Sequence, residues 1–235
     1  MNVVPFGISW NKRLTRIKET VEIARELWSQ RIIEYNGQIY GLSNAFIQVF
    51  PIDKKVPIYL AANSPKTREL SGTHADGWLA EMMSPERYKT DAQEVFDAAR
   101  FAGRNPEDID IVCVITTSVS MDVDKSREIV FQMAKRRFLW WPKQLQKYGY
   151  EVTEEFDWNY LTVNKETSEL IGRHLEEIPN EACEAVTLYG KPDDCIERIE
   201  KYVENGVSHF EFDIPQKYEE TCRLIAEKII PYFKT

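Results

Sequence analysis

The chain has 235 residues, of which 43% are hydrophobic and 29% charged, the balance of an ordinary globular protein with a buried core. Its formal net charge of −8 argues against a general nucleic-acid-binding surface. The four cysteines form no CxxC pair or Cys/His cluster, so neither a zinc site nor a disulfide framework is predicted. No apolar run has the length of a signal peptide or a membrane span, and we expect a cytoplasmic protein.

The first quarter of the chain predicts a helix, a hairpin and a buried strand. Residues 12–30 place apolar side chains at helical spacing, opposite a charged face. The pair Asn36-Gly37, inside residues 32–40, is a hairpin signal between short strands, and an extended segment follows at 45–50. The compact apolar run at 56–62 is typical of a strand covered on both faces.

Two helices and a strand are predicted next. Ser64 suits a helix N-cap and Pro65 suits a first helical turn, so a helix is expected from there to about Gly72. A short strand follows at 75–80. A long amphipathic helix is then predicted over 84–102, since Gly103 is a typical helix end.

The second half alternates in the same way. A β-rich run at 109–118 precedes a long helical and irregular stretch at 123–185. An amphipathic helix at 191–203, a final strand at 207–212 and a closing helix at 216–233 complete the chain. This order predicts parallel βα units in one domain.

The number of strands limits the choice of fold. A (β/α)8 barrel needs eight strands, whereas the sequence predicts four barrel-type strands, which begin near residues 57, 76, 109 and 207. If the fold is a barrel, we expect this chain to hold its second half.

The richest candidate site is the turn between the strand at 56–62 and the following helix. Unpaired backbone N–H groups and the helix dipole make a helix N-terminus an anion site. The hydroxyls of Ser64 and Thr67 and the ammonium of Lys66 are suitable phosphate donors. The alternative interpretation of the same residues is a plain N-cap.

Other candidates carry weaker signals. Asp76-Gly77 is interpreted as turn chemistry, and His74 as a surface or capping histidine. Glu81, at the end of its strand, is either an acid/base or substrate contact or a solvated carboxylate.

The last strand and the aromatic stretch also need an interpretation. Alternation places His209, Glu211 and Asp213 on one side of the last strand. Residues 135–141 mix basic and aromatic side chains, which favours an amphipathic helix that packs its aromatics, or a lid or subunit contact, over base stacking. No Ser-His-Asp order, nucleotide loop or metal motif occurs, so no catalytic residue is identified and no metal is predicted.

Three segments, taken in order, resemble the luciferase-like monooxygenase superfamily, and within it the methylenetetrahydromethanopterin reductase-like branch. The first runs from Arg16 through Leu27-Trp28 to Tyr35–Tyr40. The second and most specific runs from Val56 through the Asn63–Lys66 turn to Ala75-Asp76-Gly77-Trp78. The third runs from Tyr189-Gly190-Lys191-Pro192 to Gly206–Phe210.

The resemblance implies a partial TIM (β/α)8 barrel of the bacterial luciferase-like type. Residues 1–235 then form a luciferase-like domain with strands five to eight and a helical insertion before the last strand, without the family's first four βα units. It also implies that Asn63, Ser64, Lys66 and Thr67 contact the phosphate of the cofactor, which is F420 or FMN.

Two classes of function follow from the resemblance. The first is a flavin- or F420-dependent oxidoreductase that transfers a hydride to or from a small-molecule substrate; an FMN-dependent monooxygenase is the alternative enzyme. The second is a non-catalytic flavin-binding or dimerising protein that retains the phosphate turn. A homodimer is expected, with no nucleic-acid or membrane partner.

Overall fold

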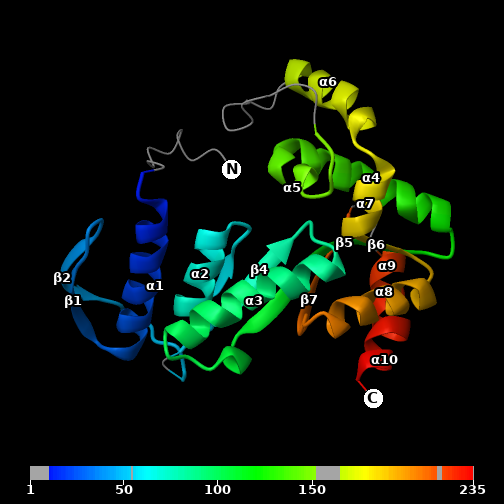
Figure 1. Ribbon diagram of the computed structural model, residues 1–235. Coiled ribbons are helices and arrows are strands. Elements are labelled where there is room, and N and C mark those ends of the chain that lie inside the picture. Colours follow the sequence, from blue (N-terminus) through cyan, green and yellow to red (C-terminus); the bar gives the residue numbers. More distant parts are fainter. Residues whose placement is uncertain (1–10, 54, 152–164, 216–218, 235) are drawn as a thin grey trace. The chain divides into compact units, whose positions relative to one another are not determined.

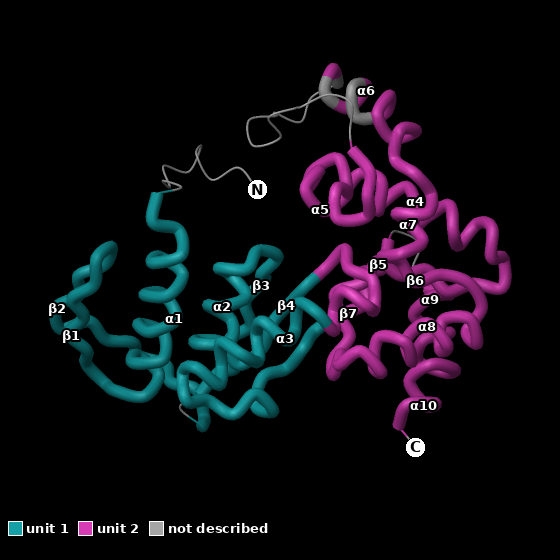
Figure 2. Tube along the Cα trace, viewed as in Figure 1, with its two compact units in different colours: residues 1–80, 90–112 teal, residues 81–89, 113–235 magenta. Residues whose placement is uncertain are grey.

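The structure, a computed structural model, describes residues 11–53, 55–151, 165–215 and 219–234 (Figure 1). Its contacts divide the chain into two compact units (Figure 2). Unit 1 comprises residues 1–80 and 90–112, and unit 2 comprises 81–89 and 113–235.

Unit 1 contains the hairpin, the first strands of the sheet and their helices. Its elements, the last three of them in part, are α1 (Arg13–Ser29), β1 (Ile32–Asn36), β2 (Gly41–Phe46), β3 (Tyr59–Ala61), α2 (Pro65–His74), β4 (Gly77–Glu81), α3 (Pro85–Phe101) and β5 (Asp110–Val119). The helices at the first three predicted positions are confirmed, with ends that differ by a few residues.

The hairpin forms as predicted, but not through a two-residue turn at Asn36-Gly37. Strands β1 and β2 pair antiparallel, and residues 37–40 connect them. The carboxylate of Glu19, on α1, accepts the backbone N–H groups of Gln38, Ile39 and Tyr40 at 2.7–3.3 Å. This longer turn follows from a long-range contact, because the three amides find their partner on α1.

The strand β3 is shorter and less covered than its apolar sequence predicts. It pairs in parallel with β4, with Tyr59 opposite Gly77 and Ala61 opposite Leu79. Its side chains are half-buried or exposed, so the prediction of a strand covered on both faces is wrong. Among the strands that the structure describes, β3 lies at one end of the sheet and pairs only with β4.

Asp76 and Gly77 have the structural role that the sequence predicts. Asp76 Oδ2 accepts the N–H of Ile58 at 2.9 Å and a bond from Arg25 at 2.8 Å. A Cβ on Gly77 would lie 2.1 Å from the ring of Tyr59, so the close approach of β3 and β4 requires a glycine here.

Unit 2 contains the rest of β5 and the C-terminal elements, and also the end of β4 and the start of α3. The further elements are α4 (Val123–Trp140), α5 (Pro142–Gln146), α6 (Lys165–His174), α7 (Asn180–Val186), β6 (Thr187–Gly190), α8 (Pro192–Glu204), β7 (His209–Asp213), α9 (Glu219–Leu224) and α10 (Ile230–Phe233). The four-residue strand β6 is absent from the sequence prediction; its length is below that at which periodicity is informative.

The main sheet has the strand order β3-β4-β5-β6, and β7 also pairs with β5. The β3–β4 and β5–β6 pairs are parallel, as expected for βα units. The sheet of the described residues does not close into a barrel.

Each unit has its own tightly packed interior. In unit 1, α2 and α3 approach so closely that a Cβ on Gly72 would lie 2.2 Å from the carbonyl oxygen of Val95. In unit 2, Phe138 and Leu139 on α4 are fully buried in an apolar cluster. The prediction of an amphipathic helix that packs its aromatics is thus confirmed for Phe138, whereas Trp141, which follows the end of α4, is 38% exposed.

Candidate functional site

The turn between β3 and α2 is built by a capping box, a reciprocal pair of side-chain bonds at the start of a helix. The N–H of Ser64 donates to Thr67 Oγ1 at 3.0 Å, and the N–H of Thr67 donates to Ser64 Oγ at 3.4 Å. The two hydroxyl oxygens lie 2.9 Å apart. Pro65 occupies the first turn of α2, so the predicted N-cap is confirmed.

The peptide carbonyl before the turn is fixed from the interior of unit 1. The indole of Trp78, which is fully buried, donates from Nε1 to the carbonyl oxygen of Ala62 at 2.6 Å. The described chain has no cis peptide bond, so the N–H of Asn63 points away from that carbonyl. The indole thereby sets the direction of the Asn63 amide.

Several polar groups at this turn have no partner among the described residues. The backbone N–H groups of Asn63 and Lys66 donate to no described atom, and the ammonium of Lys66 makes no ion pair with the described part of the chain. Asn63 Oδ1 is buried without a hydrogen bond. Two free amides, one cation and one unsatisfied acceptor are the groups that a phosphate ester with adjacent hydroxyls would pair.

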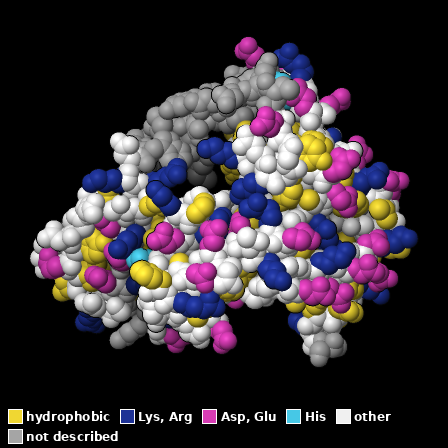
Figure 3. All heavy atoms as spheres, in the orientation of Figure 1, with side chains coloured by type: hydrophobic (Ala, Val, Ile, Leu, Met, Phe, Trp, Pro, Cys, Tyr) yellow, Lys and Arg dark blue, Asp and Glu magenta, His cyan; other side chains and the backbone are white. Residues whose placement is uncertain are grey.

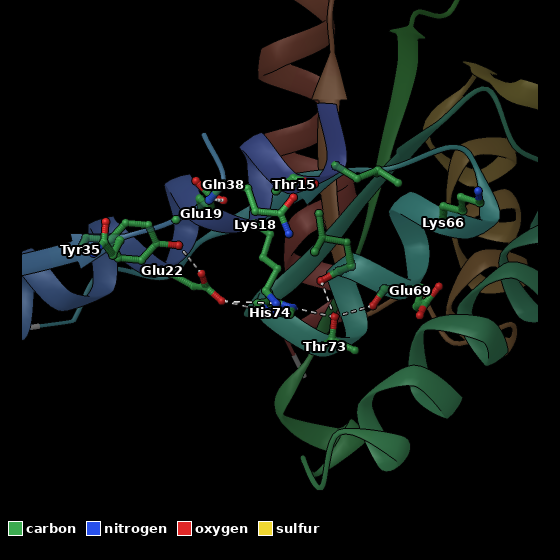
Figure 4. Close-up of a pocket in the computed structure, with 14 residues that line it drawn as sticks. Thr15, Lys18, Glu19, Glu22, Tyr35, Gln38, Lys66, Glu69, Thr73 and His74 are labelled. Atoms are coloured by element: carbon green, nitrogen blue, oxygen red, sulfur yellow. Dashed lines mark hydrogen bonds and ion pairs between the residues drawn. The ribbon is translucent and has the colours of Figure 1, made fainter. Parts of the chain in front are cut away.

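A cleft of about 680 Å³ lies beside α1, α2 and the hairpin turn (Figure 4). In Figure 4, Lys66 and Tyr35 lie far apart along this cleft, and Lys18 points toward His74 and Glu22. His74 Nε2 lies 3.6 Å from Glu22 Oε1. Burial lowers the pKa of His74, and Lys18 acts in the same direction against Glu22. The imidazole Nδ1 lies within hydrogen-bonding distance of Thr73 Oγ1, at 2.7 Å.

A second group of polar residues lies in unit 2, where strands end. Arg137, on α4, makes an ion pair with Asp213 at 2.5 Å and another with Glu81 at 3.4 Å. The guanidinium also donates to Thr116 Oγ1 at 2.9 Å. We call Glu81, Thr116, Arg137 and Asp213 the charge cluster.

Glu81 is the least compensated member of the charge cluster. Burial raises its pKa, and the negative charges of Asp213 and Glu211 act in the same direction, against Arg137. Arg137 lies closer to Asp213 than to Glu81, which explains why the ion pair does not offset burial. The interpretation of Glu81 as a solvated carboxylate is therefore wrong, since its side chain is only 26% exposed.

The last strand presents its polar residues as alternation predicts, and only part of the set joins the charge cluster. Asp213 bonds to Arg137, whereas His209 and Glu211 are exposed. Thr116 and Arg137 are not predicted from the sequence, since no local motif marks either residue. Over the described ranges, no three His, Cys, Asp or Glu side chains form a metal site, and no helix has the length and apolarity to cross a membrane.

The face of the molecule in Figure 3 carries acidic and basic side chains side by side. Such a mixed surface has no extended field of one sign on the face drawn. Ligand binding on this face therefore depends on local groups of side chains and not on an extended surface charge.

The chain is similar in sequence to known reductases and dehydrogenases. It is 27% identical over 235 residues to 5,10-methylenetetrahydromethanopterin reductase of Archaeoglobus fulgidus, with 97% of this chain and 69% of the relative covered. It is 30% identical over 238 residues to F420-dependent glucose-6-phosphate dehydrogenase of Microbacterium testaceum, with 98% and 65% covered. The chain thus spans about two thirds of the length of these relatives.

Solved structures share the α/β fold. The F420-dependent tetrahydromethanopterin reductase from Methanopyrus kandleri superposes with a TM-score of 0.76 at 21% identity, over 98% of this chain and 71% of that one. An F420-dependent secondary alcohol dehydrogenase gives a TM-score of 0.73 at 21% identity, over 94% and 63%. Residues 2–209 match the sequence model of the luciferase-like monooxygenases. The chain therefore belongs to the luciferase-like monooxygenase family.

Proposed function

We propose that the chain is an F420-dependent oxidoreductase that holds the phosphate of its cofactor at the turn between β3 and α2. The observation that carries the proposal is the set of unpaired groups at that turn: the amides of Asn63 and Lys66, the Lys66 ammonium and Asn63 Oδ1. The relatives support the choice of cofactor, because several are named F420-dependent.

Each predicted residue has a distinct part in this proposal. The amide and ammonium of Lys66 and the amide of Asn63 donate to phosphate oxygens. The hydroxyls of Ser64 and Thr67 keep the turn closed through the capping box and offer further donors. Asn63 Oδ1 accepts from a hydroxyl next to the phosphate. When bound, the deazaflavin supplies the hydride chemistry, and the chain binds and orients it.

The proposal includes the finer architecture. The sheet is part of a (β/α)8 barrel within one luciferase-like domain, and the turn lies at the carboxyl end of β3, where such folds place their sites. We also propose a small-molecule substrate, a homodimer and a cytoplasmic location. F420 and FMN both carry a phosphate ester, and the groups at the turn do not distinguish between the two. An FMN-dependent monooxygenase is therefore the second candidate.

A binding experiment with matched ligands tests the proposal. The purified chain is titrated with F420 and FMN, and with the two corresponding compounds that lack the phosphate, a phosphate-free deazaflavin and riboflavin. We expect one phosphorylated compound to bind at least roughly tenfold more tightly than its counterpart, which corresponds to about 1.4 kcal/mol. The cofactor that shows this difference identifies the branch of the family.

Variants connect that difference to the turn. Lys66→Ala and the double variant Ser64→Ala/Thr67→Ala are expected to reduce the difference between the affinity for the phosphorylated cofactor and the affinity for its phosphate-free counterpart. The control is Asp122→Ala, which removes a similar N-cap from α4, where Asp122 Oδ1 accepts the N–H of Lys125 at 3.1 Å. Equal loss of cofactor affinity in the control, or an unchanged ratio in the turn variants, contradicts the assignment.

A further inference from the structure

A buried arginine lies directly behind the turn. Arg68, on α2, is 4% exposed. Its Nε and Nη2 contact Glu94 Oε2 at 2.9 and 2.8 Å, and its Nη1 contacts Asp91 Oδ2 at 3.1 Å. The same Nη1 donates to the carbonyl oxygen of Asn63 at 3.2 Å. Both carboxylates lie on α3, so three charges from two helices meet beneath one peptide group of the turn.

Packing of the two helices does not require these charges. Gly72 already allows α2 to approach the backbone of α3 at Val95, and apolar side chains such as Val95 and Ala99 are fully buried in the same unit. Desolvation of a guanidinium and a carboxylate is costly, and apolar replacements are often as stable or more stable. Arg68 and Asp91, the two members of the group that are almost fully buried at 4% and 5% exposure, are therefore best explained by what they hold in place.

The bond from Arg68 fixes the peptide group between Asn63 and Ser64. In a trans peptide the N–H points away from the carbonyl, so a carbonyl held toward the interior directs the N–H of Ser64 toward Thr67 Oγ1, which it meets at 3.0 Å. Trp78 fixes the preceding peptide group in the same way. Together they hold two consecutive peptide groups of the turn from behind.

The charges of the group determine how it acts. One guanidinium with the two carboxylates of Asp91 and Glu94 has a net charge of −1, which by itself opposes an anion at the turn. Any favourable effect on phosphate binding must therefore come from orientation of the backbone.

We propose that Arg68, held by Asp91 and Glu94, is a positioning residue that keeps the turn in its phosphate-binding conformation. This inference rests on the proposed function, because it assigns a role toward the phosphate that the turn would bind. Arg68 contacts the backbone of the turn and acts on the phosphate through it.

Two arginines that donate to backbone carbonyls near opposite ends of α2 allow a matched experiment: Arg68, which belongs to α2, and Arg104, which follows α3. Arg104 donates to the carbonyl oxygens of Gly72 and Ala75, each at 2.6 Å, at the C-terminal end of α2. Arg68→Lys and Arg104→Lys each keep the charge and lose the geometry of bonds to backbone carbonyls. Both are expected to lower the thermal midpoint, and only Arg68→Lys is expected to affect phosphate recognition.

The quantity measured is the ratio of affinities for each phosphorylated cofactor and its phosphate-free counterpart, well below the thermal midpoint. We expect Arg68→Lys to reduce the ratio roughly tenfold, and Arg104→Lys to change it less than about twofold. A loss that is shared equally by both ligands, or an equal loss in both variants, indicates a structural role and overturns the inference.

A milder variant covers the case in which Arg68→Lys does not fold. Glu94 is 45% exposed, so Glu94→Gln is tolerable and removes one negative charge behind the turn. If the group acts by orientation, the ratio falls by roughly threefold; if it acts by charge, the ratio rises, and the inference is wrong. A wild-type ratio near one is a different result, since it overturns the proposed phosphate site together with the inference.

Discussion

The turn at Asn63–Thr67 and the charge cluster in unit 2 are constructed in opposite ways. The side-chain bonds within the turn join residues three apart in the sequence, and they connect neutral hydroxyl and amide groups. The bonds of the charge cluster join residues 21, 76 and 97 positions apart. In the cluster, formal charges on three elements already neutralise much of one another.

This difference determines what each region is able to bind. The turn retains donors and a cation without partners in the described chain, so an anion gains new bonds there at small cost. A ligand of the charge cluster must compete with Arg137 for Asp213 or Glu81. The turn is thus suited to binding an anion, and the charge cluster to holding the carboxyl group of Glu81 partly out of water.

The largest expected effect on stability is that of Arg137→Leu. The substitution leaves Glu81 and Asp213 as partly buried carboxylates without their cation, which should lower the free energy of unfolding by about 1–3 kcal/mol, less than for a fully buried pair because the side chains are 24–31% exposed. Urea denaturation at pH 7 measures the loss. The matched control is Arg127→Leu, whose pair with Asp124 is 51% and 87% exposed and should contribute less than about 0.5 kcal/mol. Equal losses would mean that the charge cluster is an ordinary surface network.

A smaller effect is expected from Ser64→Ala, at the turn. Loss of an N-cap costs about 1 kcal/mol, and Asp122→Ala should cost a similar amount at α4. The two variants should separate in cofactor binding, where only Ser64→Ala weakens the phosphate-dependent part of the affinity. Similar stability with different binding would confirm that the turn has more than a capping role.

The same contrast explains how much of the site could be predicted from the sequence. A capping box depends on residue types three positions apart, so Ser64, Pro65 and Thr67 are sufficient to locate the start of α2 from local sequence alone. Arg137 could not be found in this way, because its partners come from β4, β5 and β7. The same limit applies to Arg68. The local sequence does not indicate that this side chain is buried, because the carboxylates that pair with it lie on α3.

Long-range contacts also limit the prediction of the fold. The pair Asn36-Gly37 correctly indicates a hairpin, yet the turn extends to Tyr40 because Glu19 binds three of its amides. Strand β6 escapes prediction, since four residues give too little pattern, and it is defined by its pairing with residues 116–119 of β5. Local patterns therefore predict most elements, while turn length and strand pairing depend on partners elsewhere in the chain.

The smallest expected effect concerns pH and Glu81. Its pKa is raised by burial in the folded protein, so the folded state keeps this proton at pH values where the unfolded chain has lost it. The stabilising contribution is complete below the unfolded pKa, near 4.5, and disappears as the pH rises through the higher folded pKa. The stability of the wild type minus that of Glu81→Gln should therefore fall as the pH increases from about 4 through this window.

Urea midpoints of both proteins from about pH 4 to 7 measure this difference, and Asp124→Asn, in the exposed pair with Arg127, corrects for surface charge. A difference that rises with pH would show that attraction to Arg137 outweighs burial at Glu81. In that case the pKa of Glu81 in the folded protein would lie below that in the unfolded chain, and the ion pair with Arg137 would stabilise the fold. A falling difference would show that Glu81 holds its proton to a higher pH in the folded protein than in the unfolded chain, which is the direction of shift that favours a carboxyl group as a proton donor.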